Sequence, residues 1–338
     1  MARVFSGIQP TAEMHIGNYF GAVRNWVALQ DTHECIYCVV DLHAMTKAFD
    51  PERLRQNTER MVVNLLACGI DPQKSILFIQ SVVHEHAELC WILSCLCPLG
   101  DLRRMTQFKD KIEAVESEDT TQFVSAGFFN YPVLQAADIL VYRGDSVPVG
   151  KDQEQHLELS RELARRFNNQ FGVELFPEPA PLFTPTPKVM SLVDPTKKMS
   201  KSSGERHYIG LFEEEHSLRN KIKSAVTDSG GRPAEGELSP GVANLFEILR
   251  ACGKEANADS LMKDYEAGTL QYRVLKETVA DALVELTTEL RTRRTEIVQD
   301  MDRVNRGVEE MTDKARTIAA ATMREVRTVI GLPAIPHR

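Results

Sequence analysis

The chain has 338 residues, of which 43% are hydrophobic and 26% are charged, and its formal net charge is −8. This composition is typical of a globular protein whose length allows two domains. No uninterrupted apolar run reaches the length of a membrane span, and the acidic balance argues against general coating of DNA, although a local basic face would be enough to bind RNA. The first residues lack the hydrophobic region of a signal peptide, so we expect a cytoplasmic protein.

The first thirty residues predict a strand, a turn and a helix. Residues 4–8 have the pattern of a short strand, residues 9–13 that of a turn, and a helix begins at about His15 and runs to residue 30. Gly7 and Gly17 permit close approach of the backbone, and His15 and Asn18 offer neutral hydrogen-bond donors at the helix N-terminus. Rossmann-like folds bind nucleotides at this turn, so we interpret it as a candidate phosphate site. The alternative is an ordinary turn with a surface histidine.

The following segments alternate between strand and helix patterns, which favours a parallel sheet. We expect strands at residues 34–41, 75–80 and 147–149, and helices at 51–68, 84–97, 124–142 and 150–169. His43 follows the second strand at the edge where ligands bind, and it is either a site residue or a structural one. Side chains two apart on a helix diverge by about 200°, so we interpret His84 and His86 as surface residues at a helix N-terminus and not as a metal pair.

The seven cysteines lie mostly in apolar segments, and we expect them to be reduced. Cys35 and Cys38 resemble a metal or redox pair, but residues three apart on a strand face opposite sides of the sheet. Ligation of one metal ion by both is therefore not expected, and no second Cys/His pair stands at zinc spacing.

A polar stripe interrupts the apolar helix expected at residues 124–142. Tyr131, Gln135 and Asp138 are spaced i, i+4, i+7 and share one helix face. Buried polar groups need partners, so the stripe either lines a pocket or pairs internally. We favour the pocket.

Residues 191–210, which we name the lysine loop, have the composition of a loop and contain the run Lys198-Met199-Ser200-Lys201-Ser202. Two ammonium groups beside several hydroxyl groups suit the triphosphate of a nucleotide, and a loop is able to close only when substrate is present. The alternative is a solvated basic loop.

From residue 211 onward the pattern is nearly all helical, with a long helix at about 271–300 and a last one at about 312–330. We therefore predict an α/β protein with three parts: a Rossmann-like domain at residues 1–190 with a helical insertion around 84–130, the lysine loop at 191–210, and a helical domain at 211–338. Residues 291–327 carry nine Lys/Arg and seven Asp/Glu, a balance of +2 that suits either RNA contact or a plain amphipathic bundle.

Several motifs in this order resemble those of class I aminoacyl-tRNA synthetases. Residues 15–18 (His-Ile-Gly-Asn) are similar to the family's His-Ile-Gly-His motif, and residues 198–202 match its Lys-Met-Ser-Lys-Ser motif. Gly150-x-Asp152-Gln153 and the stripe on residues 131–138 are similar to the tyrosyl/tryptophanyl branch. Residues 5–10, 105–109, 136–140 and 190–196 resemble the bacterial tryptophanyl members, over residues 2 to about 230 and more faintly beyond.

The resemblance implies that tryptophan is activated with ATP to tryptophanyl-adenylate and then transferred to the 3′ end of tRNA(Trp). It also implies Mg²⁺ held mainly by the phosphates of ATP, no metal site built from side chains, a homodimer, and anticodon recognition by the helical domain. The residues implied in catalysis are His15, Asn18, Lys109, Lys111, Lys198, Lys201 and Ser202. The residues implied at ATP are Gln9, Pro10, Thr11, Gly17, Asn18, Gly150, Lys151, Asp152, Val189, Lys198, Met199, Ser200, Lys201 and Ser202. The residues implied at tryptophan are Phe5, Gly7, Val40, Tyr131, Gln135, Asp138, Val147, Val149 and Gln153.

The choice of amino acid depends on how many polar partners the pocket supplies. A phenol hydroxyl both donates and accepts, whereas an indole N–H only donates, so one carboxylate at Asp138 satisfies tryptophan. Phe5 stands where the tyrosyl branch has a tyrosine, but Gln135 is the residue of tyrosyl enzymes and is able to add a second bond. Lys151 also departs from the acidic residue usual at its position. The alternatives are a tyrosine–tRNA ligase and a catalytically silent tRNA-binding paralogue.

Overall fold

The computed structural model describes residues 1–11, 13–106, 125–148, 150, 154–183, 187–228 and 237–333. Its amino-terminal half is built on a parallel five-stranded sheet of order β3-β2-β1-β4-β5. The strands are β1 (Arg3–Ile8), β2 (Glu34–Val39), β3 (Ser75–Ile79), β4 (Ser146–Pro148) and β5 (Ala180–Leu182). The order reverses between β1 and β4, and in open α/β sheets ligands bind at such a switch point, beyond the carboxyl ends of the strands. The expected Rossmann-like class is confirmed.

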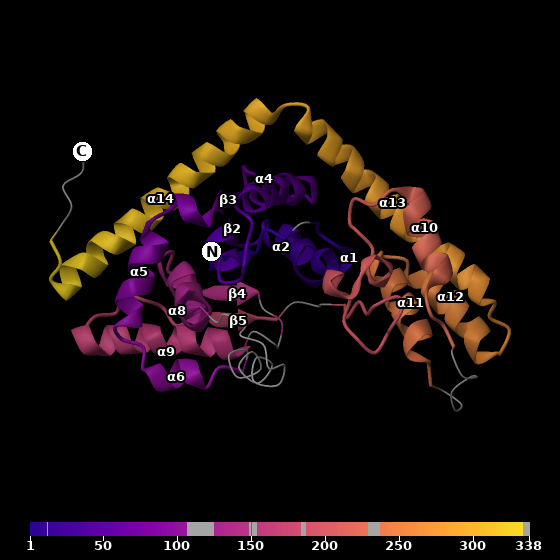
Figure 1. The fold of residues 1–338 in the computed structure, drawn as a ribbon, viewed down its shortest axis with the longest axis horizontal. Coiled ribbons are helices and arrows are strands. Elements are labelled where there is room, and N and C mark those ends of the chain that lie inside the picture. The colour runs from indigo at the N-terminus through magenta and orange to yellow at the C-terminus, as the bar shows by residue number, and fades with distance from the viewer. Residues whose placement is uncertain are drawn as a thin grey trace.

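Helices surround the sheet on both faces (Figure 1). They are α1 (Ile16–Asn18), a π-helical segment (Tyr19–Val23), α2 (Arg24–Leu29), α3 (Asp41–Ala44), α4 (Pro51–Ala67), α5 (Glu85–Ser94), α6 (Leu99–Arg103), α8 (Ala126–Leu140) and α9 (Glu154–Phe171). Asp50 caps α4 by accepting the Arg53 N–H at 2.8 Å, with Pro51 at the first helical position, as its sequence predicts.

Each face of the sheet carries its own hydrophobic core. Cys35 and Tyr37 face the core that includes α2 and α4, while Ile36 and Cys38 face the core that includes α5, α8 and α9. This alternation confirms that Cys35 and Cys38 point to opposite sides of the sheet. All seven cysteines are free thiols.

Strand β5 was not expected, because residues 176–187 are rich in proline and read as a connection. Proline cannot donate to a ladder, but an edge strand leaves one side unpaired, and β5 is the edge strand beside β4. The edge position explains why Pro181 is tolerated within the strand.

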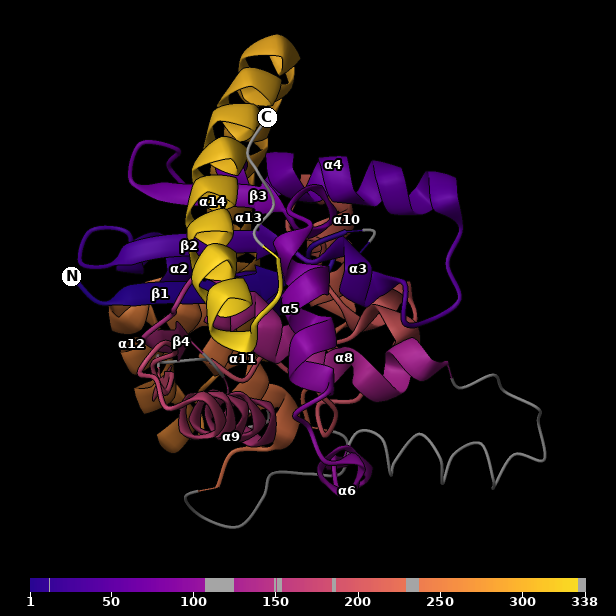
Figure 2. The same cartoon turned by 90° about the vertical axis from the view of Figure 1, so that its left-hand side faces the viewer.

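The carboxyl-terminal half is helical, as predicted, but its last helix does not stay with the others. Helices α10 (Glu215–Ser224), α11 (Pro240–Ala251), α12 (Glu255–Glu266) and α13 (Tyr272–Val298) form one group, and α14 (Met301–Ile330) follows. Figure 1 shows α13 and α14 meeting end to end at an angle, with α13 beside the other carboxyl-terminal helices and α14 over the sheet domain. In Figure 2, α14 crosses in front of β1, β2 and β3.

Within the segment 211–338 that was expected to form the helical domain, α14 packs against the α/β half. Met311 Sδ accepts the backbone N–H of Leu77 on edge strand β3 at 3.2 Å, and Arg327 pairs with Glu88 on α5 at 2.6 Å. The helix also begins eleven residues earlier than expected, because Asp300 caps it by accepting the Arg303 N–H. A periodic apolar face predicts that a helix packs, but it does not identify the partner. Among the described helices, none is long and apolar enough to cross a membrane.

Candidate active site

The turn after β1 ends in a helix cap made by two predicted site residues. The Asn18 backbone N–H donates to His15 Nδ1 at 3.3 Å, and the His15 N–H donates to Asn18 Oδ1 at 3.2 Å. These reciprocal bonds form a capping box. Because Nδ1 accepts, a neutral His15 ring carries its proton on Nε2 and keeps that N–H as a donor.

The charge state of His15 follows from its surroundings. Burial, together with the nearby ammonium groups of Lys201 and then Lys198, lowers the pKa of His15 from 6.5 to about 4. The ring is therefore neutral at physiological pH, as the sequence analysis expected for a donor at this position.

The lysine loop is anchored by a short hairpin. Ser191 N–H donates to the Lys197 carbonyl at 2.8 Å, and Met199 N–H donates to the Val189 carbonyl at 3.1 Å, so residues 189–191 run antiparallel to 197–199. Val189 and Met199 are buried, whereas Lys198 and Ser202 are exposed. Ser200 and Ser202 share a hydroxyl hydrogen bond of 2.8 Å.

This hairpin brings the lysine loop against the first turn of the chain. Lys201 Nζ donates to Thr11 Oγ1 at 3.4 Å across 190 residues of sequence, and a Cβ placed on Gly17 would lie 3.8 Å from the Cβ of Met199. Burial lowers the pKa of Lys201, because it disfavours the charged form. The structure thus brings together the two segments that the sequence singled out as phosphate sites, with Gln9 and Thr11 exposed and Pro10 buried beside them.

The second predicted cluster centres on Asp138 of α8, whose side chain is 2% exposed. Asp138 Oδ2 accepts a hydrogen bond from His43 Nε2 at 2.8 Å. Asp138 Oδ1 accepts from Gln80 Nε2 at 2.7 Å and from His86 Nδ1 at 2.6 Å. Burial alone would raise the pKa of Asp138, but the hydrogen bonds from His43 and His86 hold it well below its usual range. Asp138 is an ionised carboxylate at neutral pH.

The structure corrects the interpretation of His86 and adds partners to Asp138. His86 was expected on the surface, but it is fully buried, and its Nε2 lies 2.9 Å from the Tyr142 hydroxyl group. Helix α5 begins at Glu85, so His84 is exposed while His86, two positions further, turns inward. Asp138 was expected to accept the indole N–H of tryptophan, and the structure adds that three protein donors already contact it. A carboxylate has about four lone-pair sites, so one remains for a ligand.

Aromatic and small residues predicted for the amino-acid pocket lie around this cluster. Tyr131 is one turn before Gln135 on α8; its ring meets His43 edge-on at 6.3 Å, and its hydroxyl lies 2.7 Å from His156 Nε2. Gln135 is half-buried on the same helix. Burial raises the pKa of Tyr131 to about 12, so the phenol is neutral.

The first strand carries two further residues predicted for the amino-acid pocket, Phe5 and Gly7. Phe5 is buried and its ring stacks on Tyr142 with centroids 5.6 Å apart. Any Cβ on Gly7 would lie 2.7 Å from a methyl group of Val40, so only glycine fits there without a shift of that side chain. Val147 is buried on β4, and Gly150 follows β4 half-buried. Lys109, Lys111, Val149, Lys151, Asp152 and Gln153 lie outside the described residues.

Sequence reasoning missed Gln80, His86 and His156, and it left His43 open. Gln80 has a recognisable signal, because it directly follows β3 at the carboxyl edge of the sheet. His86 and His156 have none in a single sequence, since an inward-facing histidine on a helix is usually a satisfied structural residue.

Comparison with known proteins agrees with this geometry. The family model for class I tRNA synthetases of the W and Y type matches residues 1–288. A tryptophan–tRNA ligase of Clostridium tetani is 44% identical over 331 residues, which cover 97% of this chain and 95% of that protein. The crystal structure of tryptophanyl-tRNA synthetase from Campylobacter jejuni complexed with ADP and tryptophan is 35% identical with a TM-score of 0.83, covering 98% of this chain and 100% of the other.

A tryptophanyl-tRNA synthetase structure from Mycoplasma pneumoniae is 36% identical with a TM-score of 0.85, and 98% of each chain is covered. The match of the family model to most of the chain agrees with the nearly full-length relatives. The chain therefore belongs to the class I tRNA synthetases for tryptophan and tyrosine.

Proposed function

We propose that this chain is a tryptophan–tRNA ligase whose reaction takes place between the first turn, the lysine loop and the Asp138 cluster. Its membership of the family and the nearly full-length similarity to a tryptophan–tRNA ligase support the proposed activity. The contact of Lys201 with Thr11 supports the proposed site, because it joins two candidate phosphate-binding segments that are 190 residues apart.

In the first step, a carboxylate oxygen of tryptophan attacks the α-phosphorus of ATP. The bond to the bridging oxygen breaks, and pyrophosphate leaves with that electron pair. No covalent enzyme intermediate is needed, so catalysis consists of positioning and charge stabilisation. Lys198 and Lys201 neutralise the charge that builds on the leaving pyrophosphate, while His15 Nε2–H and the amide of Asn18 donate to phosphate oxygens.

The adenosine part of ATP lies, in this proposal, against Gly17, Gly150 and Val189. Gly17 lies in the first turn after β1, at the amino-terminal end of the helical residues 16–29, and the positive end of a helix dipole favours an anion. In the second step the acyl group passes to the 3′-terminal adenosine of tRNA(Trp), and AMP leaves.

Tryptophan lies with its indole ring between the β1 wall and α8, and its N–H donates to the free lone pair of Asp138. The carboxylate is already ionised and held by three donors, so it needs no rearrangement to accept the indole N–H. Phe5 supports this choice, because it offers no hydroxyl partner to a phenol. Gln135 is able to add a second hydrogen bond beside that of Asp138, and it defines the alternative of a tyrosine–tRNA ligase.

Magnesium belongs to this proposal as the ion carried by ATP. Within the part of the chain that the structure describes, no group of three or more His, Cys, Asp or Glu side chains is arranged to hold a metal ion. Phosphate oxygens and water suit Mg²⁺ better than a cage of protein ligands at a site of this kind. When bound, Mg²⁺ supplies neutralisation of phosphate charge, in addition to that of Lys198 and Lys201.

The helical group α10–α13 reads the anticodon in this proposal, and the enzyme works in the cytoplasm, where tRNA charging supplies protein synthesis.

The chain pairs as a homodimer. Trp91 on α5 is 74% exposed, and a second copy would bury apolar surface there. Sedimentation of Trp91→Ala against wild type tests this: unchanged dimerisation removes Trp91 from the interface.

Pyrophosphate exchange with each of the twenty amino acids tests the function. We expect exchange that depends on tryptophan and is weak with tyrosine. A rate with tyrosine that exceeds the rate with tryptophan identifies a tyrosine–tRNA ligase. Absence of exchange with every amino acid in folded protein identifies a silent paralogue.

A further inference from the structure

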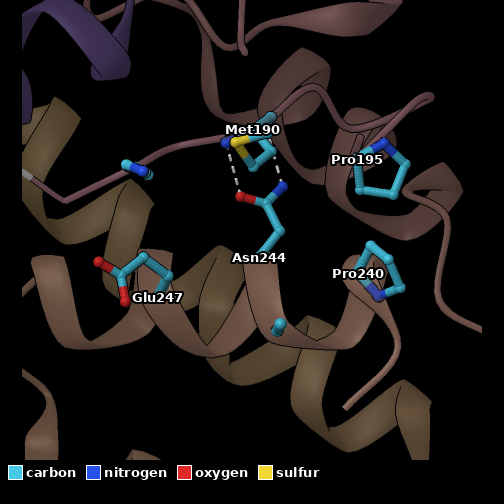
Figure 3. A pocket seen from close by; sticks show the side chains of 7 residues that line it. Met190, Pro195, Pro240, Asn244 and Glu247 are labelled. Atoms are coloured by element: carbon cyan, nitrogen blue, oxygen red, sulfur yellow. Dashed lines mark hydrogen bonds between the residues drawn. The ribbon is translucent and has the colours of Figure 1, made fainter. Parts of the chain in front are cut away.

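One side chain of the helical group hydrogen-bonds to the extended segment 189–191, which leads into the lysine loop. Asn244 lies on α11 and is 5% exposed. Its Oδ1 accepts the backbone N–H of Met190 at 2.8 Å, and its Nδ2 donates to the backbone carbonyl of Met190 at 3.0 Å. Figure 3 shows both bonds at the wall of a cavity of about 580 Å³, with Pro195, Pro240 and Glu247 around it.

Met190 is the middle residue of the extended segment 189–191, which pairs antiparallel with residues 197–199 of the lysine loop. Its neighbours Val189 and Ser191 hydrogen-bond across the hairpin to Met199 and Lys197, so the polar groups of Met190 point to the other side. Asn244 therefore completes the hydrogen bonding of this strand as a second strand would. At neutral pH an amide side chain supplies both the donor and the acceptor that this geometry requires, whereas an ionised carboxylate supplies acceptors alone.

Helix α11 is itself held firmly to the same region. Ser239 caps α11, and a Cβ on Gly241 would lie 2.3 Å from the carbonyl oxygen of Val226, so that approach is possible only for glycine. The Val226 N–H donates to the Leu192 carbonyl at 2.8 Å. The base of the lysine loop, residue 226 and α11 thus form one packed unit.

We propose that Asn244 is a positioning residue that fixes the lysine loop to helix α11, so that Lys201 stands opposite Thr11. The inference rests on the role proposed above for the lysine loop. Asn244 does not touch the phosphates; it sets where the hairpin of residues 189–199 leaves the helical group. Its loss lowers the rate of adenylate formation and leaves tryptophan binding, which depends on Asp138, unchanged.

The test uses Asn244→Asp, which keeps the shape of the side chain and removes its donor. The new carboxylate still accepts the Met190 N–H, but it faces the Met190 carbonyl without a proton to share. Protonation restores an O–H donor, so acid pH repairs the contact. We expect the rate of tryptophan-dependent pyrophosphate exchange to fall at least tenfold at pH 8, a smaller deficit relative to wild type at pH 6, and a tryptophan Kd within twofold of wild type.

The matched control is Asn168→Asp. Asn168 also closes a loop with its amide, donating to the Phe176 carbonyl at 2.8 Å and accepting from Leu175 and Phe176, but it lies on α9. This variant tests the same loss of a donor away from the lysine loop, and we expect exchange within twofold of wild type at both pH values.

A second variant keeps the test decisive if the aspartate disturbs folding. Asn244→Ala removes both bonds without adding charge, and we expect the same deficit with no recovery at pH 6. An exchange rate within twofold of wild type in folded Asn244→Asp or Asn244→Ala, or an equal deficit in Asn168→Asp, overturns the inference. If Lys201→Ala is also fully active, the role of the lysine loop fails first; if only the Asn244 variants are active, that role stands and the positioning role falls.

Discussion

At the end of the site proposed to bind the nucleotide, Lys201 donates to Thr11 through a hydrogen bond of 3.4 Å, whereas at the end proposed to bind the amino acid Asp138 accepts three hydrogen bonds of 2.6–2.8 Å. Lys198 and Ser202 are exposed, while Asp138, His43 and His86 are buried. One end is a loop that carries the ammonium groups of Lys198 and Lys201, and the other is a buried polar network around Asp138.

We infer that the difference reflects the role proposed above for each end. The phosphate charge changes during the reaction and pyrophosphate must leave, so the groups that stabilise it belong on a loop. Selection of an indole ring requires an acceptor held in place before the substrate arrives, because reorganisation would weaken discrimination. The first end should therefore control the rate, and the second should control the choice of amino acid.

The sharpest way to break this comparison is Lys201→Ala. We expect the rate of adenylate formation to fall by about 10²–10³-fold, the typical loss when one donor to a developing charge is removed. The tryptophan Kd should change by less than about threefold, because Lys201 acts in the transition state. Pre-steady-state exchange and equilibrium binding measure the two quantities.

Lys197→Ala is its control, since Lys197 is 74% exposed and pairs with Asp194 at 3.0 Å outside the proposed contact. We expect that variant to stay near wild type. Equal losses in rate and in tryptophan binding for Lys201→Ala would contradict a role confined to the nucleotide end.

At the other end, Asp138→Asn keeps the shape of the side chain but replaces one acceptor oxygen with an NH₂ group among the donors of His43, Gln80 and His86. The indole N–H of tryptophan is then left without its acceptor, which costs about 1–3 kcal/mol and corresponds to roughly 5–150-fold in kcat/KM for tryptophan. The maximal rate with saturating tryptophan should fall less. Steady-state exchange over a range of tryptophan concentrations separates the two.

Asp145→Asn is the comparison variant, because Asp145 is exposed and accepts the backbone N–H of Arg3. A discrimination between tryptophan and tyrosine that is unchanged in Asp138→Asn would place the amino-acid pocket elsewhere.

A third experiment separates charge from geometry at His15. Its pKa is lowered from 6.5 to about 4 in the folded protein, so below pH 6.5 the unfolded state binds the proton more readily. The contribution of His15 to stability is full above pH 6.5 and is lost as the pH falls towards 4, by at most about 2 kcal/mol at pH 5.

Urea unfolding at pH 7 and pH 5 measures this contribution, with His15→Asn as the reference because asparagine also caps a helix. We expect the wild type to lose more stability than the variant over this interval. An equal loss in both proteins would mean that His15 is not held neutral by its surroundings.

The sequence predicts more of the site at the lysine-loop end than at the Asp138 end. The first turn, the lysine loop and the α8 stripe are recognisable because local composition and helical spacing dictate them. That Lys201 meets Thr11 is a contact across 190 residues, which no local pattern specifies; the motifs of the family predicted it.

The buried network was only half visible. The spacing of Tyr131, Gln135 and Asp138 predicted a polar helix face that needs partners. Its partner His86 is on another helix, and the inward direction of that side chain depends on where α5 begins. The same limit applies to α14: its sequence suited either RNA contact or an amphipathic bundle, and its partner, the β3 edge, was not predicted. Burial direction and partner choice are tertiary properties, and a periodic pattern contains neither.

The smallest expected effect sharpens the comparison at Gln135. This residue shares its helix face with Asp138, one turn away. If Asp138 alone serves the indole N–H, Gln135→Met changes kcat/KM for tryptophan by less than about threefold, because a half-buried, volume-conserving change removes no bond to the substrate. The residual rate with tyrosine should fall further, since a phenol hydroxyl loses its second polar partner. Exchange assays with both amino acids on the wild type and the variant give the ratio, and a large loss with tryptophan would show that Gln135 and Asp138 share the recognition.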